Sequence, residues 1–271
     1  MPSDSARISP TAYYTAQTWV RLGFPHADLF TTRRGRLFVA LYRVLERLTG
    51  AEGGESLLVR TLRNRHATLD EAVLASDPDL VVELGAGLSP RSIALAADHA
   101  IDTIDIDLPA MLARKRALLA RHATPDLSAK LTAHYRSEPL DITDPSFGPR
   151  LKILLAGAAR PVVVAEGLIG YFDHPIKQQI LAAIHHAFAG NPRATCLFDV
   201  RISNSTPEAT RTLRLGIRIL TRNRGTPPGF PSESSALDLW HSAGFGHAEL
   251  LPLRDTATPP VMSRILLART S

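Results

Sequence analysis

The feature that most constrains the fold is an apolar strand that runs into a glycine turn and then into a helix start. The segment reads VVELGAGLSPR, residues 81–91. Glycines at 85 and 87 allow a tight turn and let a ligand approach the backbone without meeting a Cβ atom. Ser89 suits the helix N-cap and Pro90 suits the first helical position. A ligand at this turn would face backbone amides and the positive end of the helix dipole.

From about residue 79 onward, short apolar runs alternate with helical patterns, as in a parallel sheet with crossover helices. The chain has 271 residues, of which 45% are hydrophobic, enough for one large core. We therefore predict an α/β, doubly wound, Rossmann-like sheet of seven strands whose last two strands form a hairpin. The expected strands are 79–84, 101–106, 131–136, 161–166, 194–200, 246–252 and 260–268, and the expected helices are 89–98, 109–122 and 175–189.

The chain is expected to form a single domain, 1–271, with four parts. Residues 1–78 carry helical patterns over 12–22, 35–48 and 56–76 and predict a helical cap. Residues 79–202 form the ligand-binding core. Residues 203–232 interrupt the pattern and are expected to form a lid after strand five, and residues 233–271 close the sheet. Caps and insertions at the carboxyl edge of a parallel sheet often shape a substrate pocket.

The amino-acid composition limits the kinds of protein to which this chain can belong. Charged residues, glycine or proline break every apolar stretch before it could span a membrane, and the amino terminus lacks the apolar core of a secretory signal. A single cysteine excludes an intramolecular disulfide framework, which fits a cytoplasmic protein. This residue, Cys196, lies in an apolar run and is expected in the core. We expect no metal site and no membrane partner. A homo-oligomer is compatible with the sequence.

The net charge of +5 does not predict nucleic-acid binding. Only four of the 31 basic residues are Lys, which is a bias typical of genome composition. Residues 201–224 contain six Arg and one acidic residue, so this segment alone accounts for the net charge. The rest of the chain is neutral, unlike a broad nucleic-acid footprint. The expected partner is a small molecule.

The glycine turn by itself allows several interpretations. A dinucleotide fingerprint needs a third glycine three residues on, where this chain has Pro90, and a P-loop needs a following Lys and Ser or Thr. An ordinary strand-to-helix turn remains an alternative. Acidic residues at two later strand ends favour a ligand site. Asp107 follows the glycines by about 20 residues, where a carboxylate can accept from ribose hydroxyls, and Glu166 ends the fourth expected strand.

Several motifs in order resemble one known family. ELGAGLSPR at 83–91, IDIDLPAMLARKRALL at 104–119, LDITD at 140–144 and VVAEGLIGYF at 163–172 resemble the leucine carboxyl methyltransferases. ISPTAYYT at 8–15 and RHATLD at 65–70 resemble a bacterial branch of that family associated with polyketide biosynthesis. The resemblance covers roughly residues 8–200. It implies a class I methyltransferase fold and S-adenosylmethionine as cofactor.

The resemblance also implies roles for individual residues. Gly85 and Gly87 would lie under the methionine part of the cofactor, Asp107 would bind the ribose, Asp141 and Ile142 would flank the adenine, and Glu166 would lie near the amino or sulfonium end. Arg65 would bind the carboxylate of the cofactor or of the substrate, and Tyr171 would face the methyl acceptor. The complete expected cofactor site is Arg65, Glu83, Gly85, Ala86, Gly87, Asp107, Leu108, Asp141, Ile142, Glu166 and Gly167. Gly170 departs from the family, which usually has a larger apolar residue there.

The sequence constrains the residues that contact the methyl acceptor less than those that bind the cofactor. Expected catalytic residues are Tyr171, His174 and Arg65, and expected substrate contacts are Tyr13, Tyr14, Trp19, Tyr171 and Arg201. His66 and Asp199 are further candidates for a base, although each of them, like His174, could be structural. The three cap aromatics could stack on an acceptor or could form cap core.

The sequence thus predicts an O-methyltransferase acting on a carboxylate or hydroxyl of a small, polyketide-type aromatic molecule. Methyl esterification of a protein C-terminus, a noncatalytic binding module of the same fold and nicotinamide chemistry are the alternatives.

Overall fold

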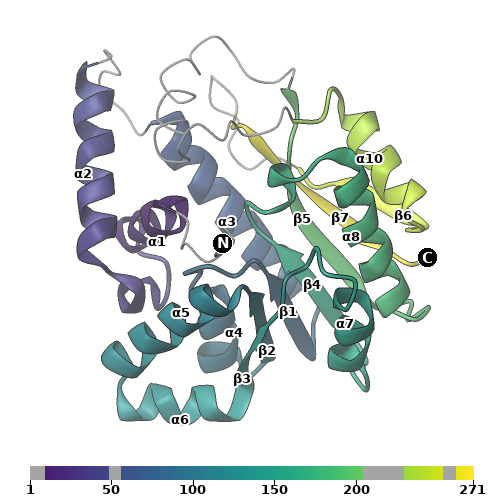
Figure 1. Ribbon diagram of the computed structural model, residues 1–271, viewed down its shortest axis with the longest axis horizontal. Helices are drawn as coiled ribbons and strands as arrows, with labels where there is room; N and C mark the ends of the chain where they lie inside the picture. The colour runs from purple at the N-terminus through teal and green to yellow at the C-terminus, as the bar shows by residue number, and fades with distance from the viewer. Residues whose placement is uncertain (1–9, 49–55, 204–228, 253–260) are drawn as a thin grey trace, which may run out of the picture.

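A computed structural model of the protein describes residues 10–48, 56–203, 229–252 and 261–271, with the side chains of 43–48 excepted. One seven-stranded sheet organises the chain, in the order β3-β2-β1-β4-β5-β7-β6 (Figure 1). The first five strands are parallel, and β7 pairs antiparallel with both β5 and β6. The strands are β1 Leu80–Leu84, β2 Asp102–Asp107, β3 Tyr135–Pro139, β4 Pro161–Ala165, β5 Thr195–Arg201, β6 His247–Leu250 and β7 Ser263–Arg269. The predicted doubly wound fold and the terminal hairpin are confirmed.

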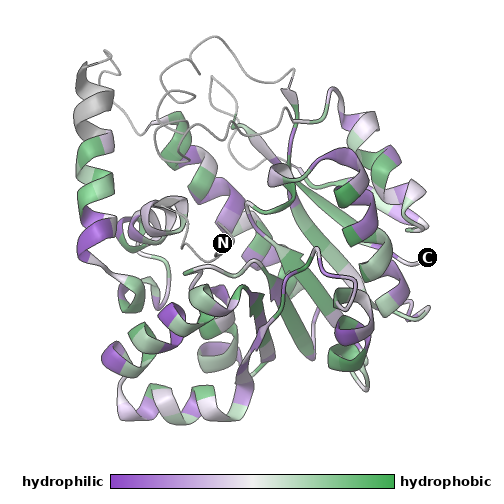
Figure 2. Cartoon of the chain, in the orientation of Figure 1, coloured by the Kyte–Doolittle hydropathy of each residue, from purple (hydrophilic) through white to green (hydrophobic). Residues whose placement is uncertain are grey.

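Helices cover both faces of the sheet (Figure 1). On one face α3 and α4 pack through residues such as Leu69, Val73 and Leu95 on β1, β4 and β5. On the other face α7, α8 and α10 pack on the same strands. Figure 2 shows that the central strands between these layers are mostly hydrophobic. The helices are α3 Leu57–Ala75, α4 Arg91–His99, α5 Pro109–His122, α6 Pro125–His134, α7 Phe147–Leu155, α8 His174–Ala187 and α10 Glu233–Ser242, with a 3₁₀ turn η3 at Ile169–Tyr171.

The helical cap is shorter than expected. It comprises α1 (Pro10–Leu22), the 3₁₀ turn η2 (Ala27–Phe30) and α2 (Arg33–Leu48). Helix α3 was expected in the cap, but it contacts β4, β5 and β7 and therefore belongs to the layer on the sheet. Its buried residues Leu69 and Val73 follow the helical period of four and face the strands.

The third expected strand is wrong in position. Residues 125–134 form α6, and β3 begins only at Tyr135. Thr124 caps this helix through its hydroxyl, Pro125 occupies the first turn, and Leu127 and Leu131 form the buried stripe. These start signals and the spacing of four outweigh the short alternating pattern that suggested a strand.

Two remaining expectations concern the interior and the insertion. Cys196 is fully buried in β5, as predicted, and burial raises the pKa of its thiol. Of the insertion expected to act as a lid, 203–232, the structure describes only Ser203 and residues 229–232. Phe230 forms a bridge with Ile202, which precedes the insertion. In the described part of the chain no helix is both long enough and apolar enough to cross a bilayer.

Candidate functional site

The candidate site lies at the carboxyl ends of β1, β2 and β4. After β1 the chain moves outward to β2 and β3, and it returns to the other side of β1 with β4 and β5. This reversal creates a switch point between β1 and β4, where open α/β sheets bind ligands. The glycine turn follows β1, Asp107 ends β2 and Glu166 follows β4, so the sheet order brings together the three segments that the sequence singles out.

Asp107 is tied to the glycine turn. Its Oδ2 accepts from the amide of Gly87 at 2.7 Å, and its Oδ1 accepts from the amide of Leu108 at 2.7 Å. Burial raises the pKa of Asp107, and the two amide hydrogen bonds offset only part of that effect. Gly85 and Gly87 both have positive φ, 60° and 52°, the backbone region that glycine adopts without a steric penalty. The carboxylate is thereby fixed at the sheet edge.

The helix start differs by one residue from the prediction. Helix α4 begins at Arg91, and Pro90, not Ser89, occupies the N-cap position. The Ser89 hydroxyl still accepts from the amide of Arg91, at 3.3 Å. Pro90 already has αR dihedrals and its carbonyl accepts from the amide of Ala94 at 2.9 Å, so the helical conformation itself begins at the proline.

Two segments close over the glycine turn. A Cβ atom at Gly85 would lie 2.8 Å from Leu168 Cδ1, so the Leu168 side chain packs directly on this glycine. A Cβ atom at Gly87 would lie 3.9 Å from the Cβ of Ala12, which belongs to α1. The cap and the segment after β4 therefore cover the glycine turn.

Arg91 is the centre of a buried charge network that the sequence analysis missed. Its side chain is fully buried and pairs with three carboxylates: Asp70 of α3, Glu83 of β1 at 2.7 Å and Glu166 at 2.6 Å. Burial works against the charged guanidinium, but these carboxylates together raise the pKa of Arg91. A basic residue in the first turn of a helix opposes the helix dipole, and this mismatch within ELGAGLSPR is the signal that could have found it.

The carboxylate of Glu166 accepts hydrogen bonds from three side chains. Its Oε1 accepts from Arg65 Nε at 2.8 Å, and its Oε2 accepts from His66 Nδ1 at 2.7 Å and from Arg91. Burial alone would raise the pKa of Glu166, but His66, Arg65 and Arg91 hold it well below its ordinary value. Glu166 is therefore an ionised carboxylate at the end of β4.

The same contacts assign the proton on His66. Its Nδ1 also lies 3.0 Å from Arg91 Nη2, and one ring nitrogen cannot donate to Glu166 and accept from Arg91 together. A bare Nδ1 lone pair 2.7 Å from a carboxylate oxygen would be repelled, so we place the proton on Nδ1 and assign the hydrogen bond to Glu166. His66 is thus a donor within the network, and its ring packs against Trp19 at 4.7 Å and Phe24 at 4.5 Å between ring centroids.

Asp199 of β5 joins the network through Arg65. Arg65 Nη1 lies 3.4 Å from Asp199 Oδ2, and Asp199 Oδ1 accepts from the amide of Gly167. Burial raises the pKa of Asp199, with Arg65 acting in the opposite direction. The network joins four carboxylates to two arginines and to His66, whose Nε2 also lies 3.5 Å from Asp70 Oδ2. Carboxylates therefore outnumber arginines in the network. Such an edge suits a cationic ligand.

Glu83 requires a correction. We expected it in the cofactor site, but its carboxylate faces α4, where Oε1 pairs with Arg91 and Oε2 accepts from Ser92 Oγ at 3.0 Å. Only 1% of the residue is exposed. In β1, side chains alternate between faces, so Glu83 points into the helix layer under the sheet and reaches the edge only through Arg91.

The other expected residues lie in contrasting surroundings. Tyr171 in η3 is 49% exposed, and His174 is exposed at the start of α8. Asp141 is exposed, with Oδ1 accepting from the amide and hydroxyl of Thr143, whereas Ile142 is buried in the core. Arg201 is partly buried at the end of β5, where its carbonyl accepts from the amide of Phe230.

The three cap aromatics expected at the acceptor are buried. Tyr13 and Trp19 pack in one cluster of the cap with Phe30, and Tyr14 packs with Val39 in another. The structure therefore places them in cap core, which was one of the two interpretations left open by the sequence.

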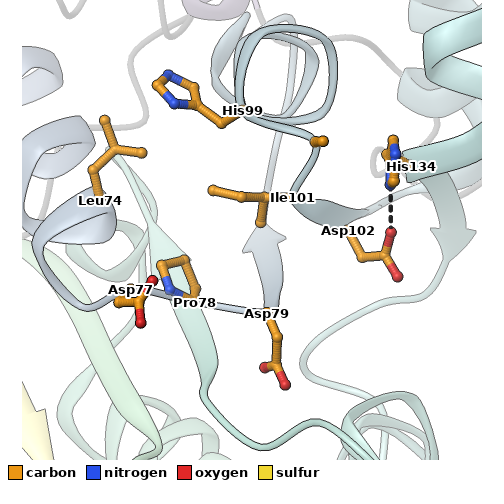
Figure 3. Close-up of a pocket in the computed structure, with 9 residues that line it drawn as sticks. Leu74, Asp77, Pro78, Asp79, His99, Ile101, Asp102 and His134 are labelled. Carbon is orange, nitrogen blue, oxygen red and sulfur yellow. Dashed lines mark hydrogen bonds and ion pairs between the residues drawn. The ribbon is translucent and has the colours of Figure 1, made fainter.

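A hollow at the opposite edge of the sheet does not belong to this site (Figure 3). It has a volume of about 580 Å³ and is lined by Asp79 and Ile101, which precede β1 and β2, by Asp102 at the start of β2, and by His134. Its carboxylates have partners within the protein, since His134 pairs with Asp102 at 2.9 Å, Asp79 accepts from two backbone amides and Asp77 pairs with Arg160. Among the described residues no cluster of His, Cys, Asp and Glu could hold a metal ion.

Residues 37–185 match the family described as leucine carboxyl methyltransferase, a span of more than half of the chain. The chain belongs to the leucine carboxyl methyltransferase family. It is an S-adenosylmethionine-dependent methyltransferase with the class I fold, as the resemblance implied. No curated protein sequence matches the chain.

Solved structures support the fold of this family member at low sequence identity. An O-methyltransferase family protein from Burkholderia thailandensis has a TM-score of 0.55 and 15% identity, over 96% of this chain and 70% of that one. N,N-8-amino-8-demethyl-D-riboflavin dimethyltransferase from Streptomyces davawensis has a TM-score of 0.52 and 19% identity, over 99% and 71%. Human N-acetylserotonin methyltransferase in complex with SAM has a TM-score of 0.51 and 14% identity, over 96% and 71%. The chain spans 58% of the length of an O-methyltransferase from Nostoc punctiforme whose structure is also similar.

Proposed function

We propose that the chain transfers the methyl group of S-adenosylmethionine to a carboxylate or hydroxyl oxygen of a small, polyketide-type aromatic molecule. The observation that carries the proposal is the ionised Glu166 at the switch point, next to the glycine turn and opposite Asp107. S-adenosylmethionine carries a sulfonium and an ammonium group, and an edge with excess carboxylates attracts both. The family match supports the same activity.

In this proposal Gly85, Ala86 and Gly87 lie under the methionine part of the cofactor, and Asp107 accepts from the ribose hydroxyls. The Asp107 oxygens are already oriented by the amides of Gly87 and Leu108, and each retains a lone pair for a hydroxyl donor. Asp141 keeps Oδ2 for the adenine amino group, because Thr143 occupies only Oδ1. Gly167 and Ile142 complete the lining of the cofactor site in this proposal.

Methyl transfer is an in-line displacement at carbon, so the protein must hold the acceptor oxygen about 3 Å from the methyl group, on the far side from sulfur. The exposed Tyr171 faces the acceptor in this proposal, and Arg65 pairs with an acceptor or cofactor carboxylate. A carboxylate acceptor is ionised at neutral pH, whereas a phenol with a pKa of about 10 gains from a base. His174 is the proposed base, since His66 and Asp199 are both engaged within the buried network.

The first experiment is calorimetric titration with S-adenosylmethionine, S-adenosylhomocysteine and, as a control, NAD. We expect binding of both sulfur ligands and about 100-fold weaker binding by Asp107→Ala, because two hydrogen bonds to a charged acceptor are lost. Asp102→Ala is the matched control, since Asp102 lies in the same strand but at its amino end. Preferential binding of NAD, or equal losses in the two variants, would contradict the proposal.

The second experiment identifies the acceptor atom. The enzyme is incubated with methyl-labelled S-adenosylmethionine and a panel of phenols, aromatic carboxylic acids and a peptide with a free C-terminal carboxylate, and the labelled products are then treated with mild base. A methyl ester releases labelled methanol, whereas a methyl ether does not. Label in neither class, but on the C-terminal carboxylate of a peptide, would indicate the alternative suggested by the family description, protein carboxyl methylation.

A further inference from the structure

A second hollow lies between the start of α2 and the helix α5, outside the network at the sheet edge. Its volume is about 790 Å³, which is in the range of small-molecule sites. Two elements separated by about 80 residues in sequence supply its cationic lining. These residues are Arg33, Arg34 and Arg36 of α2 and Arg114, Arg121 and His122 of α5.

Among the described residues no acidic side chain lines this groove, and none of its five arginines forms an ion pair with another described residue. Some surface arginines elsewhere have carboxylate partners: Arg150 pairs with Glu138, Arg160 with Asp77, and Arg264 with Glu233. Others, such as the exposed Arg136 and Arg193, form no ion pair with a described residue but line neither hollow. What distinguishes the groove is therefore that five arginines from two helices line one hollow in which no described carboxylate lies.

The groove arginines carry an unfavourable energy that an anion would relieve. Like charges on neighbouring helical positions repel, and three arginines in the first turn of α2 also oppose the helix dipole. Arg114 adds a second observation, because its Nε is buried and has no hydrogen-bond partner among the described residues. A buried N–H group without an acceptor destabilises the folded protein unless a ligand accepts its hydrogen bond.

We propose that this groove binds the diphosphate group of a small phosphorylated ligand. Guanidinium groups have a planar fork of donors that matches two oxygens of a phosphate, and several forks on one hollow suit two adjacent phosphates. Tyr13 lines the groove, and the preceding residue, Ala12, lies over the glycine turn, so the bound ligand sits on the outer side of the cap. The site is separate from the proposed methyl-transfer site and does not depend on the acceptor.

The test is calorimetric titration with inorganic pyrophosphate and with ADP at about 0.15 M salt, where exposed charges are screened beyond roughly 8 Å. The variant is Arg34→Gln/Arg121→Gln, with one substitution on each wall. The control is Arg136→Gln/Arg193→Gln, which removes the same charge from exposed positions outside the groove. We expect the groove variant to bind pyrophosphate at least tenfold more weakly and the control to bind it as the wild type does.

The two probes distinguish the source of the diphosphate. Equal affinities for pyrophosphate and ADP would indicate recognition of the diphosphate alone, whereas tighter binding of ADP, lost in the groove variant, would indicate an organic diphosphate ester. No binding of either probe, or equal weakening in both variants, would overturn the proposal. Far-ultraviolet circular dichroism of all variants serves as the folding control, so this outcome is independent of the test at Asp107.

Discussion

The interior network and the surface groove use arginine in opposite ways. Arg91 is fully buried and pairs with carboxylates from three elements, whereas the five groove arginines face one hollow and lack carboxylate partners among the described residues. A buried charge is tolerated only when paired, while an exposed charge can remain unpaired because water solvates it. Paired arginines therefore hold protein groups in place, and unpaired arginines remain available to a ligand.

The strongest test of this contrast is Arg91→Met. Removing one partner of a buried network leaves Glu83 buried without its cation, so we expect a loss of about 3–5 kcal/mol in the free energy of unfolding. Urea denaturation followed by circular dichroism measures it. Arg150→Met, which breaks the exposed pair with Glu138, is the control and should leave the midpoint unchanged. A loss of less than about 1 kcal/mol for Arg91→Met would show that the network is not needed for stability.

A smaller effect is expected for Glu166→Gln, and it depends on pH. The pKa of Glu166 is lower in the folded state than in the unfolded chain, so the stabilisation is complete above the unfolded value of about 4.3 and is lost as pH falls through the folded value. The wild type should exceed the variant by about 1–3 kcal/mol at neutral pH. Urea unfolding at neutral pH and at a pH below the ordinary pKa measures the difference. A difference that does not shrink in acid would mean that the ionised form is not what stabilises the fold.

The smallest effect concerns the groove. At low salt Arg34→Gln/Arg121→Gln should be more stable than the wild type by about 0.3 kcal/mol, because like-charge repulsion is relieved. High salt should remove this gain by screening. Thermal unfolding across a salt series measures the effect, with Arg136→Gln/Arg193→Gln as the control. A groove variant that is less stable at low salt would show that these arginines have favourable interactions within the protein.

The elements with strong local signals were predicted well. Helix α5 runs from Pro109 to His122, as expected, because proline in its first turn and a polar end define both boundaries. The prediction for β3 was wrong, since α6 and a strand that is only half-buried share a short segment in which the helical and alternating patterns overlap. Helix α3 was recognised as a helix but assigned to the cap, because its amphipathic stripe does not say which surface it covers.

The sequence by itself determined the alternation of strands and helices, the glycine turn and the acidic residues at the ends of β2 and β4. Each of these is encoded within about 20 residues, by periodicity and turn chemistry. Tertiary structure alone decided that Glu166 meets His66 and Arg91, that Glu83 faces away from the edge, and that arginines of α2 and α5 form one groove. Those contacts join residues far apart in the chain, and only the order of strands in the sheet and the packing of the helices on it bring them together.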